Sequence, residues 1–184
     1  HALTKKHSDY FELALKAEDV GRIVNNGKHA VLIGMENAFP LGENLKDVNL
    51  WAERGVRYMG ITHFGHNQFG DSSNPSTDRN ETTSKWNGLS PLGRELISSL
   101  NDAGIIVDVS HAAKSTMMQA ADLSRVPVIA SHSGIKAIND NPRNLDDEQL
   151  LKLKETGGVV QVVAYGSYVK GFTEEQKKIE ARLM

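Results

Sequence analysis

Four apolar segments of this chain each stop directly before a residue of a type that binds metal ions. The segments cover residues 30–35, 57–62, 105–110 and 126–131, and the residues that follow them are Glu36, His63, His111 and His132. Carboxylate and imidazole groups are ligands that zinc and related divalent ions prefer in proteins. The carboxyl ends of parallel strands in a barrel all point to one mouth, so these four side chains would meet there. The pattern therefore predicts a catalytic metal site.

Each of these residues also has an ordinary structural explanation when it is considered alone. Glu36 could form a buried salt bridge or cap the following helix, and His111 or His132 could be a hydrogen-bonded histidine near the core. These explanations need the same coincidence at four strand ends, so the metal site is the better interpretation. Because a glutamate has two oxygens, it can bridge two ions about 3.5–4 Å apart, which would hold a water and deprotonate it near neutral pH.

Apolar segments and the helices between them give a repeating strand–helix pattern. We expect strands at about 29–35, 56–62, 104–110, 126–131 and 159–165. We expect helices at about 4–26, 45–51, 90–102, 112–123 and 146–155. The strands are continuous apolar runs, as expected where both faces of a parallel sheet are buried.

Two α/β folds fit this pattern, a doubly wound sheet and a (β/α)8 TIM barrel. The barrel is favoured because ligand residues recur at successive strand ends, whereas a doubly wound sheet concentrates function at one switch point. A complete barrel needs roughly 250 residues, so this chain of 184 residues supplies about five of the eight βα units. We therefore expect residues 1–184 to form a single partial TIM-barrel domain that lacks its first strand or strands and its last strands. The start at His1 rather than at a methionine agrees with an upstream segment.

Composition excludes several classes of function. Lys and Arg number 21 and Asp and Glu number 23, so the net charge of −2 gives no electrostatic case for nucleic acid or an anionic membrane. The absence of cysteine excludes disulfides and thiolate metal sites, so a metal must be bound by His, Asp and Glu. No apolar run reaches the roughly 18 residues that a transmembrane segment needs. The composition does not fix the compartment, and a bacterial cytoplasmic or an exported, periplasmic location both fit.

Residues 64–87 form a connection with almost no apolar periodicity. Loops of this length are uncommon in compact domains unless they are functional or disordered. This one leaves a strand end directly after His63, so it should border the mouth of the barrel. Asn80-Glu81-Thr82 within it matches a glycosylation sequon. Four histidines lack a position at a strand end and are expected at the surface, namely His1, His7, His29 and His66.

Several short motifs occur in a fixed order between about residues 20 and 165. They are Leu32-Ile33-Gly34-Met35-Glu36-Asn37, Ile61-Thr62-His63 with the later Asn67 and Asp71, Gly88-Leu89-Ser90-Pro91-Leu92-Gly93, Asp108-Val109-Ser110-His111, Ser131-His132-Ser133 and Pro142-Arg143-Asn144-Leu145. No single motif is diagnostic, but the ordered set resembles that of the membrane (renal) dipeptidase family, the M19 metallopeptidases. The resemblance covers nearly the whole chain and implies a TIM-barrel metallo-dependent hydrolase.

The resemblance also implies a role for each matching residue. Glu36 corresponds to the carboxylate that bridges two zinc ions, and His111 and His132 correspond to ligands of the second zinc. His63 corresponds to the histidine that faces the substrate and helps to stabilise the tetrahedral intermediate. Arg143 corresponds to the residue that binds the terminal carboxylate of the substrate, which suits the bidentate fork of a guanidinium group. Without the resemblance, Arg143 would be taken for a surface residue of a polar loop.

Two parts of the family's pattern have no counterpart in this chain. The family carries a His-x-Asp pair on its first strand and an aspartate acid/base on a late strand. His7-Ser8-Asp9 has the His-x-Asp spacing but lies in the polar lead-in and not at a predicted strand, and the late aspartate has no match. Glu43 is not a substitute for either, and Asp108 is expected at most to support the ligands. We therefore expect this chain, as given, to be incomplete for activity.

The resemblance implies a zinc-dependent metallodipeptidase in which a metal-bound hydroxide attacks the peptide bond of a free dipeptide. One alternative is another binuclear-metal amidohydrolase, such as a lactonase or deaminase, although the Arg143 loop favours a substrate with a free carboxylate. A second alternative is a non-catalytic binding protein on the same scaffold. The partners expected are a dipeptide substrate and a second copy of the chain in a homodimer, without nucleic acid.

Overall fold

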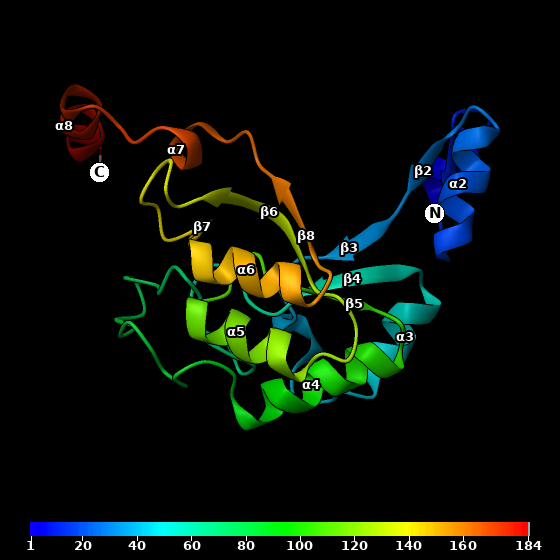
Figure 1. Ribbon diagram of the computed structural model, residues 1–184, viewed down its shortest axis with the longest axis horizontal. Coiled ribbons are helices and arrows are strands. Elements are labelled where there is room, and N and C mark those ends of the chain that lie inside the picture. The colour runs from blue at the N-terminus through cyan, green and yellow to red at the C-terminus, as the bar shows by residue number, and fades with distance from the viewer. Residues whose placement is uncertain (184) are drawn as a thin grey trace.

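The computed structural model describes residues 1–183 and contains a parallel sheet with helices packed along one side (Figure 1). Its strands are β3 (Ile33–Met35), β4 (Val56–Gly60), β5 (Ile106–Asp108), β6 (Ile129–Ile135), β7 (Asn144–Leu145) and β8 (Val159–Val162). The order is β3-β4-β5-β6, and both β7 and β8 pair with β6, always in parallel. From β3 to β6, strands that follow one another in sequence therefore lie side by side, as in the wall of a barrel, without the order reversal of a doubly wound sheet.

Helices connect these strands and cover one face of the sheet. They are α3 (Asp47–Glu53), α4 (Pro91–Asp102), α5 (Lys114–Leu123) and α6 (Asp147–Glu155), with a short 3-10 turn η1 (Phe39–Leu41) after β3. The start of α4 follows from its sequence: the Ser90 hydroxyl accepts a hydrogen bond from the Gly93 amide at 2.9 Å, and Pro91 begins the first turn. The predicted helices at 90–102, 112–123 and 146–155 are confirmed.

The hydrophobic core lies between the sheet and these helices. Met59 of β4 and Val107 of β5 are fully buried in one cluster with Leu96 and Ile97 of α4 and Met117 of α5. Burying a side chain of this size stabilises the fold by about 1.5–3 kcal/mol. This packing fixes the positions of the strands and therefore of the residues at their carboxyl ends.

Two strands differ from the sequence-based expectation in ways that affect the site. The strand predicted at 126–131 continues to Ile135, so His132 lies within β6 rather than after it. The reason is β7, which pairs with Gly134 and Ile135 and extends the ladder beyond the histidine. The strand predicted at 104–110 is shorter, because β5 ends at Asp108.

The N-terminal segment does not form the single helix predicted at 4–26. It contains α1 (Ala2–Lys6), β1 (Phe11–Leu13) and α2 (Ala17–Asn25). β1 pairs in parallel with β2 (His29–Val31), so its apolar residues alternate along a strand instead of forming a helical stripe. The single strand predicted at 29–35 is divided at Leu32, because β2 pairs with β1 whereas β3 pairs with β4. This N-terminal unit projects from one side of the main sheet (Figure 1).

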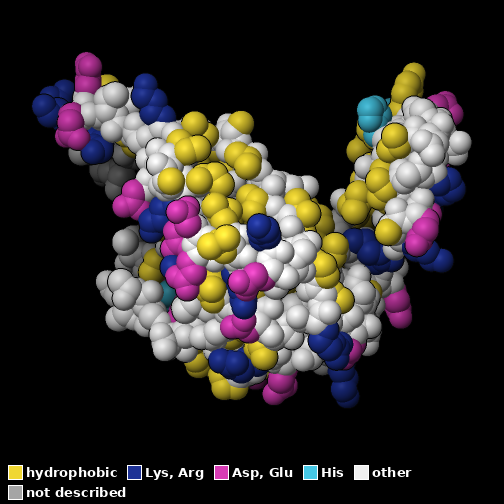
Figure 2. Space-filling model, in the orientation of Figure 1, with side chains coloured by type: hydrophobic (Ala, Val, Ile, Leu, Met, Phe, Trp, Pro, Cys, Tyr) yellow, Lys and Arg dark blue, Asp and Glu magenta, His cyan; other side chains and the backbone are white. Residues whose placement is uncertain are grey.

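The C-terminal segment projects from the opposite side. The predicted strand at 159–165 ends at Val162, and α7 (Gly166–Val169) and α8 (Glu174–Leu183) follow it. Hydrophobic side chains gather on the surface between the two projections (Figure 2), and Val159 and Val162 are among the exposed apolar residues. In the described part of the chain, no helix has both the length and the apolar character needed to cross a membrane.

Gly93→Ala is expected to destabilise the protein by about 1–3 kcal/mol. Gly93 lies in the first turn of α4, and a Cβ atom there would lie 1.8 Å from the carbonyl oxygen of Phe69, which is a backbone atom of a buried residue. Gly21 in α2 offers a matched control, because its Cβ would meet no heavy atom within 4 Å. Gly21→Ala should stabilise by about 0.4–1 kcal/mol. Urea unfolding measures both changes, and an unchanged midpoint for Gly93→Ala would contradict the close packing of α4 on Phe69.

Candidate metal centre

The three predicted metal ligands, Glu36, His111 and His132, meet at the carboxyl-end side of the sheet. The Oε1 atom of Glu36 lies 3.0 Å from Nε2 of His111 and 3.0 Å from Nε2 of His132. The two histidine Nε2 atoms are also 3.0 Å apart. Glu36 directly follows β3, His111 follows β5 by a short turn and His132 lies within β6. Three separate strands therefore bring their side chains to one point.

A sharp backbone turn places His111 in this cluster. Its φ angle is 68°, in the left-handed region that residues with a β-carbon rarely adopt. Such a conformation costs of order 1–3 kcal/mol and persists only where surrounding contacts hold it. Here the carbonyl oxygen of His111 accepts a hydrogen bond from the Ser73 amide at 2.8 Å, so the long loop after β4 helps to hold the turn.

Burial keeps the His111 imidazole neutral. Its side chain is 4% exposed, and burial, together with the nearby Arg143, His63 and His132, lowers the pKa of His111 from 6.5 to about 2. A neutral imidazole has one nitrogen lone pair available to a cation. Because Nε2 faces Glu36 and His132, it is the nitrogen of His111 in position to bind.

The three side chains fit a divalent cation. Their ligand atoms all lie within 4.8 Å of one another and comprise two imidazole nitrogens and one carboxylate oxygen. This donor set is typical of zinc and other first-row divalent ions. Among the residues whose side chains the structure describes, no other group of three or more such side chains comes together in this way.

His63 lies beside this cluster but outside it. Its Nε2 atom is 3.6 Å from Oε1 of Glu36, and its ring centroid is 4.2 Å from that of His111. The side chain is 37% exposed, which leaves it open to the solvent at the edge of the mouth. This position differs from that of the other three residues and suits contact with a bound molecule.

Arg143 is buried rather than at the surface of a polar loop. The residue is 3% exposed, and its Nη2 atom donates a hydrogen bond to the carbonyl oxygen of His132 at 2.9 Å. Its guanidinium group lies 5.4 Å from the centre of the Tyr168 ring. Burial lowers the pKa of Arg143 from its usual value, and its Nε atom has no hydrogen-bond partner among the described residues. A buried guanidinium group with a free donor suits an anionic ligand.

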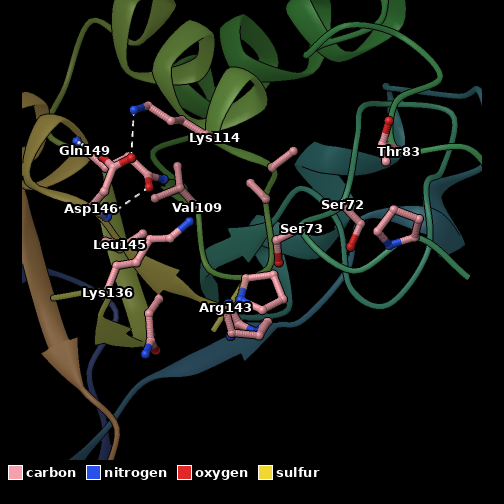
Figure 3. A pocket seen from close by; sticks show the side chains of 15 residues that line it. Ser72, Ser73, Thr83, Val109, Lys114, Lys136, Arg143, Leu145, Asp146 and Gln149 are labelled. Carbon is pink, nitrogen blue, oxygen red and sulfur yellow. Dashed lines mark hydrogen bonds and ion pairs between the residues drawn. The ribbon is translucent and has the colours of Figure 1, made fainter. Parts of the chain in front are cut away.

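Arg143 also lines a cavity of about 270 Å³ (Figure 3), which is separate from the pocket that Glu36 and His132 line. The cavity lies between the loop that contains Ser72, Ser73 and Thr83 and the starts of α5 and α6. Lys114 lines it too, but this ammonium group is already paired with Asp146 at 2.7 Å.

The prediction that His66 lies at the surface is wrong. The residue is 6% exposed, its Nδ1 atom accepts a hydrogen bond from the Ser72 amide at 3.0 Å, and its Nε2 atom lies 2.9 Å from the carbonyl oxygen of Thr82. The loop at 64–87 folds back on itself and encloses the ring, which a pattern based on strand ends could not reveal. His1, His7 and His29 are exposed, as predicted.

Asp71 organises this loop. Its two oxygens accept hydrogen bonds from Ser84 Oγ, Lys85 N, Trp86 N and Gly88 N, at 2.6 to 3.1 Å. Burial alone would raise the pKa of Asp71, but these hydrogen bonds outweigh burial and hold the pKa below its usual range. The Asp71 carbonyl accepts a hydrogen bond from Ala113, and Ser72 pairs with Ala112, so the loop is attached to the two residues that follow His111.

Asp71→Asn should destabilise the protein by about 1–3 kcal/mol at pH 7, because it replaces a hydrogen-bonded carboxylate by an amide with fewer acceptor sites. The folded-state pKa of Asp71 is depressed, so its contribution is complete above the unfolded pKa of about 3.9 and is lost as the pH falls through the folded value. Chemical unfolding at pH 7 and at pH 3 measures this. The difference in unfolding free energy between Asp71→Asn and the unmodified protein should shrink at pH 3. A difference that is the same at both pH values would show that the ionised Asp71 carboxylate does not stabilise the loop.

Two serines next to the ligands were not predicted as site residues. Ser110 and Ser131 directly precede His111 and His132, and both contact the carboxylate of Asp108. The repeated Ser-His dipeptide at two strand ends was the signal that could have identified them.

The parallel βα architecture and a nitrogen and oxygen cluster at the strand ends define a TIM-barrel metallo-dependent hydrolase. The family description that matches residues 1–182 is "Membrane dipeptidase (Peptidase family M19)". The dipeptidase tcpJ of Claviceps purpurea is 36% identical over 156 residues, which are 85% of this chain and 35% of that protein.

Solved structures of similar proteins agree. The probable dipeptidase PvdM from Pseudomonas aeruginosa has a TM-score of 0.93 at 36% identity, covering 99% of this chain and 46% of that one. A metallopeptidase from Rhodobacter sphaeroides, solved with a phosphinate mimic of the dipeptide L-Ala-D-Ala, has a TM-score of 0.76 at 26% identity, covering 87% of this chain and 45% of that one.

The chain belongs to the M19 family of membrane dipeptidases, so the resemblance and the fold class predicted from the sequence are confirmed. Membership of a metallopeptidase family implies a metal cofactor. The chain spans between 35% and 46% of the length of these three relatives.

Proposed function

We propose that the protein to which this chain belongs is a zinc-dependent dipeptidase that hydrolyses the peptide bond of free dipeptides. The observation that carries the proposal is the convergence of Glu36, His111 and His132, with 3.0 Å between their ligand atoms. The M19 family supplies the reaction class. Zinc is proposed because two imidazoles and a carboxylate suit it better than they suit calcium or magnesium, which prefer oxygen ligands.

We assign the metal ligands as follows. Glu36, His111 and His132 would hold the metal, and the Glu36 side chain is 51% exposed. A second ion at Glu36 stays a prediction. When bound, the ions act as Lewis acids that polarise the peptide carbonyl and make a water more acidic. The neutral state of His111 favours ligation because an imidazolium ion has no nitrogen lone pair to offer a cation.

His63 and Arg143 are proposed to act on the substrate. His63 borders the cluster with Nε2 3.6 Å from Glu36, where an imidazole N–H can donate to the oxygen on which negative charge develops. Arg143 is proposed to bind the terminal carboxylate of the dipeptide, because it is buried, contacts the backbone of His132 and has an Nε donor without a partner among the described residues. The phosphinate dipeptide mimic bound to the Rhodobacter relative supports this substrate class. The expected homodimer stays a prediction.

Removal of the metal tests the proposal. The complete protein, stripped with a chelator and shown by elemental analysis to be metal-free, is expected to lose dipeptide hydrolysis and to regain it when Zn²⁺ is added. The physical reason is that the Lewis acid supplies several kcal/mol of the stabilisation of the transition state. Full hydrolysis by the metal-free protein would overturn the proposal, as would zinc-loaded protein that binds metal but cleaves no dipeptide.

A further inference from the structure

Asp108 links the two histidine-bearing strand ends without touching either histidine. It is 2% exposed and lies at the end of β5. Its Oδ1 atom accepts hydrogen bonds from the Ser110 and Ser131 amides, each at 3.0 Å. These serines directly precede His111 and His132, so one carboxylate oxygen fixes the backbone at both positions.

The second oxygen of Asp108 begins a chain of contacts that ends on a histidine ring. Oδ2 accepts the hydroxyl hydrogen of Ser131, and Oγ of Ser131 lies 2.7 Å from Nδ1 of His132. On the other side of the ring, Nε2 of His132 faces Glu36 and His111 at 3.0 Å. The ring therefore has the serine at one nitrogen and the proposed metal position at the other.

The direction of these hydrogen bonds follows from the number of hydrogens. A serine hydroxyl has one hydrogen, and an ionised carboxylate can only accept. If Ser131 donates to Asp108, its oxygen must accept from His132, so Nδ1 carries the proton and Nε2 keeps its lone pair. The opposite arrangement would leave Oδ2 of Asp108 without its hydrogen bond, which is costly for a buried carboxylate.

We propose that Asp108 and Ser131 are positioning residues that hold His132 in the Nδ1-protonated tautomer and so present its Nε2 lone pair to the metal. This inference rests on the proposed ligation by His132. Partners of the second ring nitrogen are known to orient metal-binding histidines, and their loss typically lowers metal affinity about 10–100-fold. In this chain a serine hydroxyl stands between the carboxylate and the ring.

Asp108→Asn should reverse the chain of hydrogen bonds while preserving its shape. The orientation of the new amide is fixed, because its oxygen must replace Oδ1 and accept from the Ser110 and Ser131 amides. Its NH₂ group then faces Ser131 and donates to that hydroxyl, which must turn its own hydrogen toward Nδ1 of His132. The ring is then held with Nε2 protonated, and that nitrogen cannot bind a cation.

The double variant separates this mechanism from a general loss of structure. Ser131→Ala removes the hydroxyl that would otherwise donate a hydrogen bond to Nδ1 of His132 in the Asp108→Asn variant. Ser131→Ala should therefore lower zinc affinity less than Asp108→Asn does. In the double variant Asp108→Asn with Ser131→Ala, affinity should return to that of Ser131→Ala alone. A purely structural role of Asp108 predicts instead that the two losses add. Ser131→Thr keeps the hydroxyl and should retain affinity.

The experiment uses the complete protein with Zn²⁺ alone as the probe. Nitrogen-15 NMR of histidine-labelled, metal-free protein identifies the tautomer, and the signals of His132 are assigned by their loss in His132→Gln. Competition with a chromophoric chelator measures the affinity for zinc. We expect Nδ1-protonated His132 in the unmodified protein, Nε2-protonated His132 in Asp108→Asn, and a 10–100-fold loss of zinc affinity in that variant.

An unchanged tautomer with unchanged affinity in Asp108→Asn, or additive losses in the double variant, would overturn the inference. If circular dichroism shows that Asp108→Asn does not fold, Ser131→Ala and Ser131→Thr test the inference instead. The inference requires that only the threonine variant keep His132 in the Nδ1-protonated tautomer. An unmodified protein that binds no zinc would refute the proposed function instead, and the tautomer measurement would still test the hydrogen-bond chain.

Discussion

His111→Ala in the complete protein is expected to abolish dipeptide hydrolysis and to remove bound zinc at the same time. The imidazole lies 3.0 Å from both Glu36 and His132, so its loss takes one of the three ligand atoms of the proposed ion. The remaining two side chains do not make a closed site, since zinc in proteins generally uses at least three protein ligands. Elemental analysis after dialysis and a dipeptide assay on the same sample measure both effects.

His63→Ala is the informative comparison. It borders the cluster but its Nε2 atom lies 3.6 Å from Glu36, so its removal should leave the zinc content unchanged. It should lower kcat by about 10²–10³-fold, or about 2.7–4 kcal/mol, because a donor to the developing oxyanion acts mainly in the transition state. Equal loss of metal in both variants would show that His63 is a ligand and that its assigned role is wrong.

The second large effect concerns the substrate's carboxyl group. If Arg143 binds it, the unmodified enzyme should cleave free dipeptides at least about tenfold more efficiently than their C-terminal amides. The amide offers no charge to the guanidinium group, and losing a hydrogen bond to a charged group costs about 1.5–3 kcal/mol. Because Arg143 is 3% exposed, no bulk water would replace the missing carboxylate easily. Comparison of kcat/KM for paired acids and amides measures the preference.

Variants of Arg143 locate the source of this preference. Arg143→Ala should slow the free acid and leave the amide nearly unchanged, which shrinks the discrimination. Arg143→Lys should retain part of it, because an ammonium group keeps the charge but not the bidentate fork. Since Arg143 also packs on Tyr168, thermal unfolding must be compared in parallel. Equal turnover of acids and amides by the unmodified enzyme would favour a broader amidohydrolase.

The parts of the fold that the sequence predicted are those with a strong local signal. Ser90-Pro91 marks the start of α4, and the capping pair Asp146 and Gln149 marks that of α6, because each satisfies backbone amides within one turn. The apolar runs likewise located the strands that carry the ligands. The convergence of Glu36, His111 and His132 could be predicted because the carboxyl ends of parallel strands in a barrel all point to one mouth.

The parts that were missed depend on contacts between distant residues. The strand β1 exists because β2 pairs with it, and β6 reaches past His132 because β7 pairs with its end. The burial of His66 depends on how the loop at 64–87 folds over it. The contact between Asp108 and Ser131 joins residues 23 positions apart, and no periodicity of the chain encodes it.

The attachment of the long loop to His111 has a consequence for engineering. The backbone of residues 71–73 is hydrogen-bonded to residues 111–113, so the loop that borders the cavity is built into the support of a proposed metal ligand. An exchange of the whole loop between relatives, intended to transfer substrate preference, would therefore also disturb the left-handed turn at His111. A graft limited to residues 74–83 leaves these attachments intact. Substrate selection is thus expected to be modular only over that shorter segment.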